Sequence, residues 1–121
     1  GWCYVLFAAM PELADQSPLR DLKDQLGPEL AVFTVAVMPA IVEEISFRGM
    51  LQGRLMALLG YGQGLVVTAM AFTLVHLSPA TMPIHLGLGL YLGWLRERSA
   101  SLWPGIFVHF AYNTLVLFVL D

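Results

Sequence analysis

Apolar residues in this chain gather into five blocks, separated by short stretches that contain polar residues, glycine or proline. The polar stretch 11–29 (PELADQSPLRDLKDQLGPE) is expected to be a loop with a short amphipathic helix at 18–26. GYGQG at 60–64, SPATMP at 78–83 and RERSAS at 96–101 are expected to separate the later blocks. No block alternates apolar and polar residues with a period of two, so the pattern predicts helices rather than strands. The apolar blocks are 2–10, 30–42, 65–77, 84–95 and 102–120.

The lengths of these blocks bear on whether they cross a membrane. A helix that spans a bilayer needs about 20 mainly apolar residues. Only 102–120 reaches that length alone, with Pro104 expected in its first turn, where a missing N–H is tolerated. The second block is expected to continue as a helix from about 29 to 59, through the charged residues that follow Val42. Inside lipid, helices satisfy their own backbone groups, so the prediction is an all-α polytopic transmembrane helical bundle with about four to five membrane helices.

The chain divides into two predicted parts. Residues 1–28 are interpreted as the end of a preceding membrane helix followed by the polar loop, and residues 29–121 as the core. The start GWCYVLFAAM resembles the tail of a hydrophobic helix, so the chain is expected to be a piece of a longer membrane protein. In the core, Gly89 and Gly93 form a GxxxG pair that would let their helix pack closely against a neighbour.

Composition agrees with an outer surface that faces lipid. Of the 121 residues, 58% are hydrophobic and 12% are charged, where about 25% charged is usual in a soluble domain. The net charge is −3 and the six Lys and Arg residues form no basic run, which argues against a nucleic-acid partner. Cys3 is the only cysteine, so neither an internal disulfide nor a cysteine-based metal cluster can form.

A few ionisable or strongly polar residues lie inside the apolar segments. Such residues are costly in a membrane and usually functional. Their spacing places several of them on shared helix faces, four residues apart, as with Glu44 and Arg48. Glu43 projects about 100° away from Glu44 and is expected to face a cavity. The set consists of Glu43, Glu44, Arg48, Arg54, His76, His85, His109 and Asn113.

Three helices would therefore bring polar groups to one interior site. Phe72 shares a face with His76, and His109 shares a face with Asn113. A carboxylate in an apolar pocket is a stronger base, because desolvation disfavours its charged form, and it can activate a water with help from a histidine. A histidine and an asparagine opposite could donate hydrogen bonds to a developing oxyanion. The set thus permits a peptidase in which water attacks and no covalent intermediate forms.

Other interpretations of the same residues stay open at this point. Membrane helices use His, Asn and Glu–Arg pairs simply to associate, and chains of acids and histidines also serve transport or proton relays. Glu43, His76 and His109 could instead hold zinc, although no HExxH motif is present. No GxSxG motif supports serine chemistry, and His85 is interpreted as a packed or interfacial histidine.

The order of the motifs narrows these possibilities. EExxxR, FxxxH and HxxxN follow one another on successive hydrophobic segments over roughly residues 30–120. In that order they resemble the CPBP family of intramembrane proteases, which includes the Rce1-like CAAX prenyl protease 2 and the Abi proteins. His85 lies outside the family's motifs, and members usually have more helices than the blocks seen here.

The resemblance implies a role for each matching residue. Glu43 would be the catalytic base for water, assisted by His76, while His109 and Asn113 would stabilise the oxyanion. Three further residues would shape the site: Glu44, Arg48 and Phe72.

The resemblance also implies a function. It is that of an intramembrane endopeptidase without a cofactor, embedded as a multi-pass protein in a prokaryotic cell (inner) membrane. Its partners would be the lipid bilayer and a membrane protein or lipid-modified protein substrate, processed at a CAAX-type end or a C-terminal sorting signal. A non-catalytic immunity or scaffold protein of the same fold, and a zinc-dependent version of the protease, are the alternatives.

Overall fold

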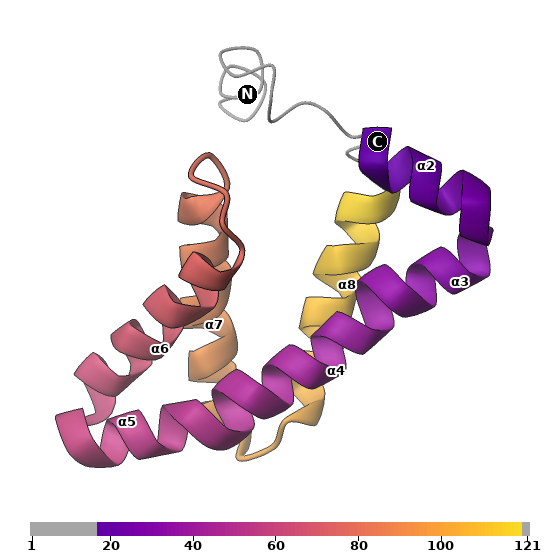
Figure 1. The fold of residues 1–121 in the computed structure, drawn as a ribbon. Helices are drawn as coiled ribbons and strands as arrows, with labels where there is room; N and C mark the ends of the chain where they lie inside the picture. Colours follow the sequence, from indigo (N-terminus) through magenta and orange to yellow (C-terminus); the bar gives the residue numbers. More distant parts are fainter. Residues whose placement is uncertain (1–16, 120–121) are drawn as a thin grey trace.

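The structure, a computed structural model, describes residues 17–119 and contains helices and connecting turns, with no strand among these residues. This confirms the all-α helical bundle (Figure 1). In chain order the elements are α2 (Ser17–Leu26), α3 (Pro28–Val32), the π-helical segment η2 (Phe33–Val37), α4 (Met38–Glu44), the π-helical segment η3 (Ile45–Leu51), α5 (Gln52–Leu59), α6 (Tyr61–Val75), α7 (Met82–Ser99) and α8 (Trp103–Val119).

The elements α3 to α5 form one continuous helix of 32 residues, Pro28–Leu59, as the pattern predicted. Among the described residues it is the one helix that is long and apolar enough to cross a membrane. The expectation that 102–120 would reach this length alone is wrong for the described part of the chain, where α8 has 17 residues. The short amphipathic helix expected at 18–26 is confirmed as α2.

Two predicted separators are shorter than expected. Gly60, with φ of 88°, ends α5 by itself, and the rest of GYGQG forms the first turn of α6. The prediction that 60–64 is a break is therefore wrong beyond Gly60, because one left-handed residue suffices to turn the chain. RERSAS is also mostly helical, since α7 continues through Ser99 and ends at Ala100, which adopts the left-handed conformation.

The long helix forms one side of the bundle, and three helices pack against it. Figure 1 shows α8 lying along the α3–α4 part and α6 rising from the α5 end, with α7 behind α6. Many large apolar side chains face outward, among them Met50, Leu74 and Phe107, which are 60%, 56% and 64% exposed. Exposed apolar area on this scale marks a surface that contacts lipid or protein rather than water.

One prediction falls on residues that the structure does not describe. It is the apolar block at 2–10, which contains Cys3 and lies outside residues 17–119. The division of the chain at residue 28 stays a prediction as well.

Candidate active site

The long helix contains one π-helical segment before the acid pair and another directly after it. Pro39 lies in the first turn of α4 and has no N–H to donate to the carbonyl of Val35, and the segment before it is π-helical. A second π-helical segment, η3, begins directly after Glu44. Such segments inside an α-helix occur frequently at functional sites, because they change the direction in which the following side chains point. Glu43 and Glu44 thus lie at a point where the helix departs twice from regular geometry.

Glu44 is buried and accepts two hydrogen bonds through one of its carboxylate oxygens. Its side chain is 1% exposed, and its Oε1 accepts hydrogen bonds from Nη1 of Arg48 and from Nδ1 of His109, each at 2.9 Å. A methyl group in place of hydrogen at Gly105 would lie 3.1 Å from Oε2, so this glycine leaves room for the carboxylate. Buried charges persist only when they are paired and hydrogen-bonded. Arg48 and His109 satisfy that condition, as the i, i+4 spacing predicted for Arg48.

Arg48 joins three helices. Besides its bond to Glu44, it donates from Nη2 to the carbonyl of Gly89 at 3.0 Å, and its guanidinium lies 4.4 Å from the ring centroid of Phe72. The glycine carbonyl is accessible because α7 carries no side chain at this point. The contact with the Phe72 ring is a cation–π interaction in a desolvated place, where such contacts are strongest.

Glu43 has the opposite environment. Its side chain is 28% exposed, and its Oε2 lies 3.7 Å from Nε2 of His76 and 3.5 Å from Nε2 of His109. Oε2 is itself buried and has no hydrogen-bond partner among the described residues. The two histidines are thus close enough for charge interaction but too far away for direct hydrogen bonds.

The tautomers of the two histidines follow from their other contacts. Nδ1 of His76 lies 2.7 Å from the carbonyl oxygen of Phe72, which can only accept, so Nδ1 carries a proton. Nδ1 of His109 likewise donates to the carboxylate of Glu44. In its neutral form each ring therefore presents an unprotonated Nε2 towards Glu43, and in its charged form a second N–H.

Phe72 separates the two histidine rings. Its ring centroid lies 4.7 Å from that of His76 and 5.5 Å from that of His109, in edge-to-face arrangements. Phe72 is fully buried, and the edge of Phe47 packs on it at 5.5 Å. Phe72 therefore forms an apolar wall beside Arg48, His76 and His109.

Asn113 is turned towards the long helix. Its Nδ2 lies 3.4 Å from the carbonyl oxygen of Ala36, in the π-helical segment η2. It lies one helical turn beyond His109 on α8, as the HxxxN spacing requires. Its role at an oxyanion position stays a prediction. Arg54, another residue singled out in the sequence, is exposed on α5 and contributes nothing to the site.

Sequence reasoning missed Gln52. This side chain is 1% exposed and donates to the carbonyl of Gly93 at 3.1 Å and to Glu97 at 2.9 Å. It repeats the contact of Arg48 with Gly89 one turn further along both helices. The signal was present: RxxxQ on one helix matches GxxxG on the other, and each polar side chain reaches a glycine carbonyl.

His85 packs against the site. Its ring stacks on that of His76, with centroids 4.1 Å apart and an angle of 26° between the planes. Tyr112 lies at its other edge, with a centroid distance of 6.1 Å. The site therefore holds three histidines, because the turn at 76–81 brings the end of α6 beside the start of α7.

The alternative zinc site lacks support in the geometry. Among residues 17–119, no group of three His, Cys, Asp or Glu side chains has the arrangement of a metal site. The three residues that would have formed it do approach one another: Oε2 of Glu43 lies 3.7 Å from Nε2 of His76 and 3.5 Å from Nε2 of His109.

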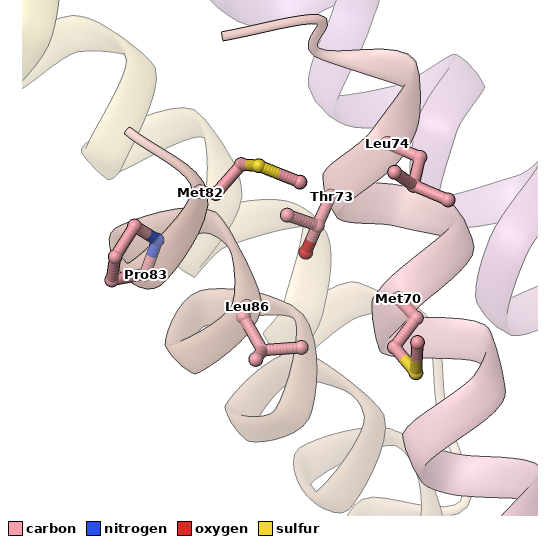
Figure 2. A pocket seen from close by; sticks show the side chains of 6 residues that line it. All are labelled: Met70, Thr73, Leu74, Met82, Pro83 and Leu86. Atoms are coloured by element: carbon pink, nitrogen blue, oxygen red, sulfur yellow. The ribbon is translucent and has the colours of Figure 1, made fainter. Parts of the chain in front are cut away.

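An apolar cavity has a lining that does not include the acid pair. It has a volume of about 340 Å³ and opens between α6 and α7. Figure 2 shows that six side chains from these two helices surround it. They are Met70, Thr73, Leu74, Met82, Pro83 and Leu86.

The chain is similar to a relative whose name describes a membrane peptidase. It is 25% identical over 88 residues to "Putative membrane peptidase YdiL" of Bacillus subtilis (strain 168), across 73% of this chain and 36% of that protein. The chain thus spans about a third of this relative's length, and no solved structure matches it. A family model described as type II CAAX prenyl endopeptidase Rce1-like matches residues 25–115, which include all three motifs. The resemblance is thereby confirmed: the chain belongs to the Rce1-like family, whose members are embedded in membranes.

Proposed function

We propose that this protein is an intramembrane endopeptidase in which Glu43 activates a water molecule for attack on a peptide bond. The observation that supports this most directly is the contrast within the acid pair. Oε1 of Glu44 accepts two hydrogen bonds, from Arg48 and His109, whereas Oε2 of Glu43 is buried without a hydrogen bond, beside two histidine nitrogens. If the polar set served only to hold helices together, Oε2 of Glu43 should be hydrogen-bonded as well, because a buried carboxylate oxygen without a hydrogen bond is destabilising.

A water beside Glu43 has suitable neighbours for activation. It can donate one hydrogen to Oε2 of Glu43 and the other to the unprotonated Nε2 of His76. Its oxygen then attacks the carbonyl carbon of the substrate, forming a C–O bond while Glu43 takes the proton. The proton passes to the leaving nitrogen as the C–N bond breaks, which yields a carboxylic acid and an amine. General base catalysis of this kind contributes about 10²- to 10⁴-fold.

His109 and Asn113 are proposed to stabilise the oxyanion. Glu44 fixes the orientation of His109 through the hydrogen bond to its Nδ1. In the form that carries a proton on both ring nitrogens, Nε2 of His109 would donate to the developing oxyanion. Asn113 would add a second donor after releasing the carbonyl of Ala36, a contact that is long at 3.4 Å. Arg48 balances the charge of Glu44.

The proposed substrate is a membrane-associated protein that is cleaved near a lipid-modified or membrane-embedded end. Three features support this proposal. The acid pair lies near the middle of the 32-residue helix, the outer surface is apolar, and the family is named for an endopeptidase. We further propose a multi-pass location in a prokaryotic inner membrane, with α6 and α8 as two of the other crossing helices.

The test is cleavage of a co-expressed membrane substrate by the intact protein and by Glu43→Gln. Gln keeps the size of Glu but cannot accept the proton, so we expect kcat to fall at least about 100-fold. Glu29→Gln is the matched control, because Glu29 is exposed at the start of the same long helix and should leave cleavage unchanged. Folding of each variant is checked by its unfolding temperature in detergent.

Two outcomes would contradict the proposal. Undiminished cleavage by Glu43→Gln would remove Glu43 from the chemistry and favour a non-catalytic scaffold with activity from another source. Loss of wild-type cleavage on chelation, restored by added zinc, would favour the zinc-dependent alternative. Cleavage that resists the chelator and fails in Glu43→Gln, His76→Ala and His109→Ala supports the glutamate-activated water.

A further inference from the structure

His76 lies at the C-terminal end of α6, although its ring must stay directed at Glu43. It follows the last residue of α6, with φ of −78° and ψ of −12°, and its N–H bonds to the carbonyl of Thr73 in a tightened final turn. Leu77 comes next, in the left-handed conformation with φ of 51°. Helix ends fray more readily than helix interiors, since their terminal groups lack full hydrogen bonding. The backbone of α6 alone therefore constrains His76 weakly.

Two contacts from its own helix partly fix the ring of His76. Nδ1 donates to the carbonyl of Phe72 at 2.7 Å, and the ring of Phe72 packs against it at 4.7 Å. Both come from the preceding turn of α6. They would move together with His76 if that end of the helix opened.

His85 supplies the contact from another helix. Its ring is stacked nearly parallel on that of His76, with centroids 4.1 Å apart. His85 lies in the first turns of α7, where Nδ1 donates to the carbonyl of Thr81 at 3.0 Å and Tyr112 of α8 packs at its edge. Because Nδ1 of each histidine is bound to a backbone carbonyl, the contact between the rings is one of faces rather than a hydrogen bond.

The surroundings make this stack important for holding the end of α6 against the start of α7. Thr73 and Leu74 on α6 face Met82 on α7 across the cavity of about 340 Å³ (Figure 2). A second apolar cavity of about 220 Å³ reaches from these residues to the turn at Leu77 and Ser78. Side chains therefore do not fill the space on this side of the α6–α7 pair. The ring stack, on the side that faces Glu43, secures the end of α6.

We propose that His85 is a positioning residue that clamps the ring of His76 so that its Nε2 stays directed at Glu43. The proposal rests on the proposed function, in which His76 orients the attacking water. His85 does not touch the water or the substrate in this scheme. It acts through its flat face, so another flat aromatic side chain should replace it.

The experiment compares His85→Ala with His85→Phe in the intact protein, with cleavage rates measured in liposomes. Aromatic pairs contribute enough stabilisation that removing one should lower kcat roughly three- to tenfold, with KM little changed. His85→Phe should keep kcat within about twofold of wild type. Tyr91→Ala is the matched control: it removes an aromatic contact with Trp94 on the same helix, away from the site, and should leave kcat unchanged.

A second readout does not depend on activity. In protein with isotope-labelled histidine, the NMR signals of the His76 ring should be single in wild type and in His85→Phe. They should broaden or split in His85→Ala. An unaltered His76 signal in His85→Ala would overturn the clamp.

The activity data can overturn the clamp independently. A loss of kcat in His85→Phe as large as in His85→Ala would show that the imidazole itself is needed. If wild-type protein shows no cleavage that depends on Glu43, the proposed function fails, while the NMR comparison still decides whether His85 holds His76.

Discussion

Glu43 lies between two groups of side chains that are held in different ways. On one side is the charged side, made of Glu44, Arg48 and His109, in which three buried side chains are linked by hydrogen bonds of 2.9 Å. On the other is the aromatic side, made of Phe72, His76 and His85, in which ring contacts of 4.1 to 6.4 Å hold the histidines. The charged side is in the interior of α4, η3 and α8, and the aromatic side is at the junction of α6 and α7.

Because of this difference, the two sides should tolerate amino-acid substitutions to different degrees. Charge-assisted hydrogen bonds in a desolvated place are strong and depend steeply on geometry, so the charged side should fail when any member is removed. Ring contacts are weaker and less directional, so the aromatic side should tolerate aromatic replacements. A peptidase site could use both properties: a His109 held by hydrogen bonds for the oxyanion, and a His76 held by ring contacts beside the entering water and substrate.

The largest effect is expected when the charged side loses its cation. Arg48→Ala leaves the carboxylate of Glu44 buried without its main counter-charge, and breaking a buried pair in this way costs about 3 to 5 kcal/mol. We expect that loss in the free energy of unfolding, measured by denaturant titration in detergent micelles. Arg54→Ala on the exposed face of α5 is the control and should change it by less than about 0.5 kcal/mol. A loss below about 1 kcal/mol in Arg48→Ala would mean that the charged side is not a tight unit.

A smaller effect is expected when a methyl group is added where α6, the helix that leads to the aromatic side, packs on α5. The helix that carries Phe72 and His76 approaches α5 closely at Gly64, where an added Cβ would lie 2.5 Å from Cα and N of Met56. Backbone atoms cannot move aside as a flexible side chain can, so Gly64→Ala should destabilise the protein by about 1 to 3 kcal/mol.

The control for this substitution lies two residues earlier on α6. At Gly62 nothing lies within 4 Å of an added Cβ, so Gly62→Ala should leave stability unchanged or slightly improved. The same unfolding titration checks both variants. Equal behaviour of the two would show that close packing of α5 and α6 does not support the aromatic side.

The sequence allowed the charged side to be predicted better than the aromatic side, for a physical reason. Glu44 and Arg48 pair within one helix, so a spacing of four residues was enough to predict the contact. The convergence of His76 and His109 on Glu43 was also predicted, from faces and approximate depth. The order of the three motifs indicated the family before any geometry was known.

The stack of His85 on His76 could not be predicted in this way. It depends on how the turn at 76–81 reverses the chain, and the left-handed residue of that turn is Leu77, which gives no glycine signal. The start of α6 and the end of α7 were mispredicted for a related reason. Gly and Arg are compatible with a helix, and tertiary packing decides whether the helix continues through them.

The smallest predicted effect concerns the turn that connects the two sides. Ala100 ends α7 with φ of 53°, and its N–H bonds to the carbonyl of Arg96 at 3.0 Å, before the chain enters α8. A side chain in this left-handed conformation is strained, whereas glycine is not. Ala100→Gly should therefore raise the free energy of unfolding by about 0.5 to 1 kcal/mol.

The same substitution at Ala57 is the matched control. Ala57 is exposed within α5, where the backbone is regular, so Ala57→Gly should lower stability by about 0.5 to 1 kcal/mol. Cleavage should be unchanged in both variants, because neither side of the site contains these residues. A changed kcat in Ala100→Gly, together with higher stability, would show that the strained turn sets the distance between the charged and the aromatic side. The two sides would then depend on each other. An unchanged kcat, with stability raised in Ala100→Gly and lowered in Ala57→Gly, would support two sides that are each held by their own contacts.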